Sequence, residues 1–162
     1  MTTVADIWKY LEEVPDPEIP VISVIDLGVV REIVLTQNGG VEVTITPTYT
    51  GCPAMNEISM GIRLKLMEKG FRDIHIVEQL SPAWSTDWLS DDGRKKMQDY
   101  GIAPPEKQVT TDSLFAELDG ITCPQCGSTH TRMVSEFGST ACKAMYQCNT
   151  CLEPFDYFKC HH

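Results

Sequence analysis

The sequence predicts an α+β protein: a small α/β sandwich ordered as helix, β-hairpin, helix and strand, followed by a zinc-ribbon-like C-terminal domain. In the first part of the chain, hydrophobic spacing alternates between helical and strand periods. Six of the seven cysteines lie between residues 123 and 160, and only Cys52 precedes them. Residues 121–162 carry three acids and three bases, so the formal charge of −10 belongs to the segment before them. We therefore expect domains at residues 1–101 and 121–162, joined by a linker over residues 102–120.

The first domain begins with a helix and a hairpin. Residues 5–13 have helical spacing, and the three prolines within residues 15–20 then end the run, because a helix interior does not tolerate proline. Residues 29–35 and 41–45 are rich in strand-forming side chains, and an Asn-Gly-Gly turn separates them. These patterns predict a short helix, a rigid turn and a β-hairpin.

A second helix and a third strand follow. Between residues 53 and 69 the apolar side chains repeat every three or four positions, from a proline suited to the first turn to a glycine suited to the exit. Residues 73–79 predict a strand, and residues 91–100 predict a charged, solvent-facing helix. In the linker we expect a single helical turn at residues 114–118.

The C-terminal segment contains two Cys-x-x-Cys pairs separated by 21 residues. Each pair can present two sulfur atoms to one ion from a tight turn, and two such turns complete a tetrahedron of thiolates. A segment of about 40 residues has too little core to fold alone, so the metal would serve as its core. The sequence therefore predicts a four-cysteine metal site with these ligands: Cys123, Cys126, Cys148 and Cys151.

Zinc is the default ion for this site, because it suits four sulfur ligands and has no redox chemistry. The same four thiolates also suit an iron–sulfur cluster, and paired redox dithiols are a third interpretation. Cys142 and Cys160 exceed the needs of a four-ligand site. Each is either a small buried apolar residue or an additional thiol for iron or persulfide.

Cys52 is a candidate for a second, labile site. If a helix begins at Pro53, Cys52 occupies its N-cap, where free N–H groups and the helix dipole lower the pKa of a thiol. A thiolate there would be reactive or would bind metal; the alternative is a buried cysteine that packs the turn. Asp16 and Glu18, in the proline-rich turn, are candidate carboxylate ligands, although acids in such turns are ordinarily solvated.

Composition and motifs exclude several classes of function. The excess of acids repels nucleic-acid phosphates and anionic lipid, so we expect no nucleic-acid or membrane partner. The N-terminal segment is acidic where a signal peptide is basic, and no stretch has the roughly 18 apolar residues of a membrane span. We expect a cytoplasmic protein. Without a phosphate-binding loop or a nucleophile paired with a base, we expect no hydrolytic catalysis.

Several motifs also resemble known families. DPEIP at 16–20, DLGVV at 26–30 and TPTYTGCP at 46–53 resemble the small α/β domain of SufT-like iron–sulfur assembly factors. A longer resemblance runs nearly end to end and is to the PaaD (PaaJ) family. It is carried by SPAWSTDW at 81–88, YGI at 100–102, SEFGSTACK at 135–143 and EPFDYFKC at 153–160.

The PaaD resemblance implies an accessory protein of bacterial phenylacetate degradation rather than an enzyme. Proteins of this family are encoded with the phenylacetyl-CoA epoxidase, whose oxygenase uses a di-iron site and whose reductase carries flavin and a [2Fe–2S] cluster. The implied role is maturation, with iron or an iron–sulfur cluster delivered to the epoxidase system, especially its reductase. Cys52 would be the working cysteine, and the iron–sulfur assembly machinery a further partner.

A single cysteine cannot complete the ligand shell of a cluster, so a cluster at Cys52 requires a homodimer, a shared small thiol, or ligands from the client. Two other functions remain open. The chain is either an interaction subunit that stabilises the epoxidase complex through its ribbon and the segment 84–88, or an iron–sulfur electron carrier. Bound iron and sulfide in protein purified without oxygen would separate these functions.

Overall fold

The computed structural model describes residues 1–105 and 120–159, and these form two compact units, Met1–Gly93 and Arg94–His162. The division falls near the start of the helix at residues 91–100, whereas the sequence placed the first boundary at residue 101. The expected linker residues 106–119, with the helical turn at 114–118, lie outside the described residues. We describe each unit by itself.

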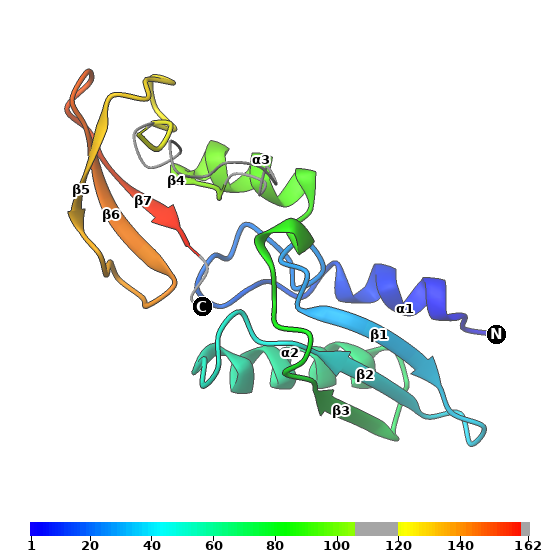
Figure 1. The fold of residues 1–162 in the computed structure, drawn as a ribbon. Helices are drawn as coiled ribbons and strands as arrows, with labels where there is room; N and C mark the ends of the chain where they lie inside the picture. Colours follow the sequence, from blue (N-terminus) through cyan, green and yellow to red (C-terminus); the bar gives the residue numbers. More distant parts are fainter. Residues whose placement is uncertain (106–119, 160–162) are drawn as a thin grey trace. The chain divides into compact units, whose positions relative to one another are not determined.

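The first unit has two layers, with helices against one face of a three-stranded sheet (Figure 1). Its elements are α1 (Val4–Leu11), β1 (Val30–Leu35), β2 (Val41–Ile45), α2 (Ala54–Glu68), β3 (Ile74–Glu78) and the 3-10 helix η1 (Thr86–Trp88). The strands lie in the order β1-β2-β3; β1 is antiparallel to β2, and β3 is parallel to β2. The predicted order of helix, hairpin, helix and strand is therefore confirmed.

Local sequence signals account for these elements. Thr3 and Asp6 form a capping box at the start of α1: the Thr3 N–H donates to Asp6 Oδ2 at 2.8 Å, and the Thr3 hydroxyl accepts from the Asp6 N–H. On α2 the periodic apolar residues Met55, Ile58, Ile62 and Leu66 are all buried. Alternating side chains of β2 add to the same core, which includes Val41, Val43 and Ile45.

The segment between β3 and α3 is fixed to the turn that precedes β1. Trp84 is only 2% exposed, and its indole N–H donates to the Leu27 carbonyl at 2.9 Å. Gly28 has a φ of +76°, and a Cβ there would lie 2.4 Å from the Trp88 carbonyl oxygen. The guanidinium of Arg31 lies 3.5 Å from the centre of the Trp88 ring. Trp84 is therefore a core residue of this unit.

The second unit contains most of α3 (Asp91–Tyr100), which begins at the end of the first unit, and a four-stranded sheet. Its strands are β4 (Ile102–Ala103), β5 (Thr131–Ser135), β6 (Lys143–Cys148) and β7 (Pro154–Phe158), in the order β4-β7-β6-β5. Strands β5, β6 and β7 are antiparallel, and β4 pairs parallel to β7. Helix α3 has the predicted bounds and is mostly exposed, with Met97 buried. Within the described residues, none of the helices has the length and apolar composition to cross a bilayer.

Candidate metal centres

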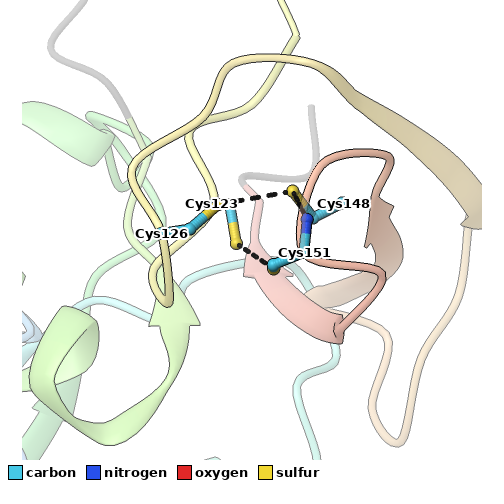
Figure 2. Close-up of side chains that lie close together, drawn as sticks. All are labelled: Cys123, Cys126, Cys148 and Cys151. Carbon is cyan, nitrogen blue, oxygen red and sulfur yellow. Dashed lines mark hydrogen bonds between the residues drawn. The ribbon is translucent and has the colours of Figure 1, made fainter.

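Four cysteines of the second unit converge as the sequence predicts (Figure 2). The ligand atoms of Cys123, Cys126, Cys148 and Cys151 all lie within 4.8 Å of one another. The Sγ atoms of Cys123 and Cys151 are 3.8 Å apart, and those of Cys126 and Cys148 are 3.6 Å apart. A tetrahedral ion with Zn–S bonds of about 2.3 Å separates its sulfurs by about 3.8 Å. The spacing of the sulfur atoms therefore fits zinc.

Two turns of similar construction hold these sulfurs. In the first, the Gly127 N–H donates to the Cys123 carbonyl at 2.9 Å, and Gly127 has a φ of +75°. In the second, Leu152 takes the corresponding position after Cys151, with a φ of +66°. A hydroxyl contact of 2.9 Å between Ser128 and Thr150 joins the turns. In each turn the residue after the second cysteine adopts the left-handed backbone conformation. Only the first turn has a glycine at this position.

Backbone N–H groups stabilise the thiolate of Cys148. The Cys151 N–H lies 3.5 Å from Cys148 Sγ, and the Thr150 N–H lies 3.4 Å from it. These donors, the Cys151 N–H above all, lower the pKa of the Cys148 thiol to about 6. A thiol that ionises near neutral pH is prepared to bind a metal ion.

The cysteines are also much of the apolar core of the ribbon. Ala103, Cys123, Cys148 and Phe155 are buried together, with Ile121, Tyr146, Cys151 and Tyr157 partly buried around them. The Tyr146 ring stacks on Phe155 with centroids 5.9 Å apart. Three of these eight residues are candidate ligands, so the core without a metal is small.

The surplus cysteines lie outside this group. Cys142 is 2% exposed, and its Sγ lies 3.1 Å from the Thr140 hydroxyl oxygen. Among the described residues it does not belong to the group of four, and its surroundings are those of a buried structural cysteine. Cys160 lies outside the described residues.

Cys52 lies in the loop between β2 and α2, as the sequence predicts, but not at the N-cap. Pro53 is the N-cap residue of α2 and makes no side-chain capping bond, so Cys52 precedes the cap by one residue. Its side chain is partly exposed. The Ala54 N–H donates to the thiol, and the side chains of Thr48 and Tyr49 also hydrogen bond to it.

The expectation of a lowered Cys52 pKa is wrong. Partial burial raises the pKa of the thiol, and the negative charge of Glu18 raises it further, while the Ala54 N–H acts in the opposite direction. The loss of solvent around the half-buried thiol raises its pKa more than the Ala54 N–H at the start of the helix lowers it. Cys52 is therefore a protonated thiol at neutral pH, and a metal that binds it must displace a proton.

The negative charge of Glu18, in the proline-rich turn, acts on the Cys52 thiol, but within residues 1–105 and 120–159 the ligand atoms of Cys52, Asp16 and Glu18 do not form a close group as those of the ribbon do. Asp16 has a different place: its side chain is 5% exposed, and Oδ1 accepts the N–H groups of Glu18 at 2.9 Å and Ile19 at 2.7 Å. Asp16 thus shapes the turn that carries Glu18. Sequence analysis did not assign a role to Tyr49 or Thr48, although both belong to the loop it singled out.

Comparisons with known proteins agree with this division. Residues 4–68 match the family described as iron–sulfur cluster assembly protein, and residues 107–159 match the PaaD zinc beta ribbon domain. A protein of Escherichia coli, provisionally named as one of the subunits of 1,2-phenylacetyl-CoA epoxidase, is 48% identical over 157 residues, covering 97% of this chain and 93% of the relative.

Two further similarities concern the first unit. An "Fe-S protein maturation auxiliary factor" of Porphyromonas gingivalis is 37% identical over 93 residues, covering 57% of this chain and 88% of that protein. The crystal structure of a domain of unknown function from Bacillus anthracis matches 57% of this chain and 89% of its own, with a TM-score of 0.54 and 24% identity. The latter similarity shows the fold alone.

Proposed function

The chain belongs to the PaaD family, and from this premise we propose that it is a non-catalytic maturation factor that supplies iron or an iron–sulfur cluster to the phenylacetyl-CoA epoxidase system. The observation that carries the proposal is the contrast between its two sulfur sites. Four sulfurs of the ribbon form a closed shell, whereas Cys52 offers one partly exposed thiol within the region that matches iron–sulfur assembly proteins.

In this proposal the ribbon site is structural. Cys123, Cys126, Cys148 and Cys151 hold zinc, which leaves no open position for chemistry. Cys142 takes no part, because it is buried beside Thr140. The ion fixes the two turns of the ribbon and so preserves the surface that this unit presents to its partners.

The cargo site is the thiol of Cys52, with Glu18 as its carboxylate ligand. Asp16 acts as a positioning residue, because its Oδ1 accepts the Glu18 N–H. One protein thiolate cannot hold a cluster alone, so the rest of the ligand shell comes from a small thiol, a second copy or the client. Such a mixed shell favours transfer, because the cysteines of the receiving protein need to replace only one protein thiolate of this chain along with its weaker-held partners.

The raised pKa of Cys52 contributes to release. Because the protonated thiol is favoured at neutral pH, proton uptake by Cys52 competes with the bound metal. Hydrogen bonds from Ala54, Thr48 and Tyr49 stabilise the thiolate while the cargo is bound. We propose the [2Fe–2S] reductase of the epoxidase system as the client, since it needs a cluster before it can transfer electrons.

The experiment is anaerobic maturation of the reductase with wild-type protein and with Cys52→Ser. Cys142→Ser is the matched control, because it removes another cysteine outside the quartet. We expect the reductase matured with Cys52→Ser to contain flavin but little cluster by absorbance and iron analysis, while ribbon zinc stays at one per chain in each variant. A reductase loaded equally by Cys52→Ser would overturn the proposal.

The same samples test the other candidate functions. An interaction subunit would give a stoichiometric complex, and full epoxidase activity, independently of Cys52. An electron carrier would hold a cluster on the ribbon cysteines that is reversibly reduced. Colourless protein with one zinc per chain and no reducible chromophore would argue against the electron carrier.

A further inference from the structure

Helix α2 has an apolar stripe on the side away from the core. Its buried side is formed by Met55, Ile58, Ile62 and Leu66, whereas Met60, Leu64 and Met67 are 57%, 58% and 60% exposed. The exposed three are spaced by four and three residues, so they line up along one side of the helix. An exposed helix side ordinarily carries polar residues, as α3 does.

The stripe continues from the proposed cargo site. Cys52 precedes Pro53 and the first residue of α2, and Pro53 is exposed seven residues before Met60, two helical turns along the same side. At a rise of about 1.5 Å per residue, the stripe begins about 10 Å from the start of the helix. A protein that lies on the stripe therefore reaches the end of the helix where the Cys52 thiol is held.

We propose that this stripe is the docking surface for the client protein, and this inference rests on the proposed function of Cys52. The client that fits is a basic protein with an apolar patch. Residues Met1–Gly93 contain fifteen acidic and six basic residues, a formal charge of −9, so this unit as a whole attracts a basic protein. Four of the six basic residues lie on α2 or directly after it, so the contact with the stripe itself is apolar rather than ionic.

A second copy of the chain fits this stripe less well. A stable dimer buries about 800 Å² on each partner, which three half-exposed side chains cannot provide. If the two helices were parallel, Glu57 would face its own copy across the stripe. If they were antiparallel, the two Cys52 residues would lie at opposite ends of the 15-residue helix, about 20 Å apart. A small apolar area instead suits a client that must bind and then leave.

The test measures binding of the full-length protein to purified apo-reductase without oxygen. The double variant Met60→Gln/Leu64→Gln replaces two of the three side chains of the stripe with residues that keep helix propensity. Its matched control is Val34→Gln/Val77→Gln, which changes two residues 43% exposed on the other face of the sheet. Ribbon zinc content and tryptophan emission report whether each variant is folded.

We expect the stripe variant to bind about tenfold more weakly or worse, and the control to change by less than about twofold. Higher salt should weaken binding of the wild-type protein, since the attraction is between unlike charges. The inference fails if the stripe variant binds and matures the reductase as the wild-type protein does. It also fails if sedimentation shows that the wild-type protein is a dimer and the stripe variant is a monomer, because a second copy of the chain then occupies the stripe.

The outcomes separate this inference from the proposed function. If the wild-type protein matures the reductase and the stripe variant does so equally well, only the docking surface is wrong. If the wild-type protein neither binds nor matures the reductase, both are wrong. If the stripe variant loses maturation at low concentration and regains it at high concentration, while Cys52→Ser does not, both are supported.

Discussion

Removal of zinc should unfold the ribbon and leave the first unit folded. Structural zinc sites of this kind release about 10–16 kcal/mol on binding. The apolar core around Phe155 and Tyr146 is small, and three of its eight members are candidate ligands. A core in a domain of this size supplies no more than about 3–5 kcal/mol. Loss of the ion therefore removes more stabilising free energy than the apolar core of the ribbon supplies. The first unit has its own core of buried aliphatic side chains and should stay folded.

The distribution of aromatic residues makes this prediction measurable. All three tryptophans, Trp8, Trp84 and Trp88, lie in Met1–Gly93, so tryptophan emission reports only on the first unit. After chelation under reducing conditions we expect unchanged tryptophan emission and an unchanged thermal midpoint by that signal. Amide hydrogen exchange over residues 120–159 should become fast, and returning one zinc per chain should restore protection. Ribbon amides that stay protected in metal-free protein would refute this reasoning.

Three further predictions follow from single residues. The raised pKa of Cys52 predicts that iodoacetamide modifies this thiol more slowly than a free cysteine at pH 8, and that the rate rises as pH increases. Glu18→Gln should speed the modification of Cys52, and equal rates in the wild-type protein and the variant would contradict the effect of the Glu18 charge on the thiol. Gly28→Ala should lower the free energy of unfolding by roughly 2 kcal/mol or more, because φ at Gly28 is +76° and the new Cβ meets the Trp88 carbonyl. Denaturant unfolding followed by tryptophan emission measures this change, and a change near zero would be inconsistent with the turn. Leu152→Gly should stabilise the zinc-loaded ribbon by about 1 kcal/mol, since φ at Leu152 is +66° and the side chain is 68% exposed. An unchanged or lower midpoint of ribbon unfolding would contradict backbone strain at Leu152.

The secondary structure could be predicted because its causes are local. The spacing of Met55, Ile58, Ile62 and Leu66 identifies both the existence of α2 and the side that it buries. The Asn-Gly-Gly turn identifies the hairpin of β1 and β2. In the ribbon, the spacing of the cysteines identifies the four that converge, but the sequence gives no comparable signal for β4, because its two residues are held by a partner strand far along the chain.

The Cys52 site could be predicted only in part. Its position in the loop before α2 follows from the motif around it, but its pKa depends on how deeply the loop packs and on the charge of Glu18. Likewise, a carboxylate at residue 16 is equally compatible with metal binding and with a turn. The contacts to the N–H groups of Glu18 and Ile19 show what Asp16 does in the folded chain.

The sequence by itself determined the order of the helices and strands and the group of four ribbon cysteines, since periodicity and short spacings depend on neighbours along the chain. Only the tertiary structure decided the parallel pairing of β2 with β3, the burial of Trp84 beneath the Leu27 carbonyl, and the upward shift of the Cys52 pKa. Each of these depends on desolvation or contact between residues distant in the sequence, and such effects exist only once the chain has packed.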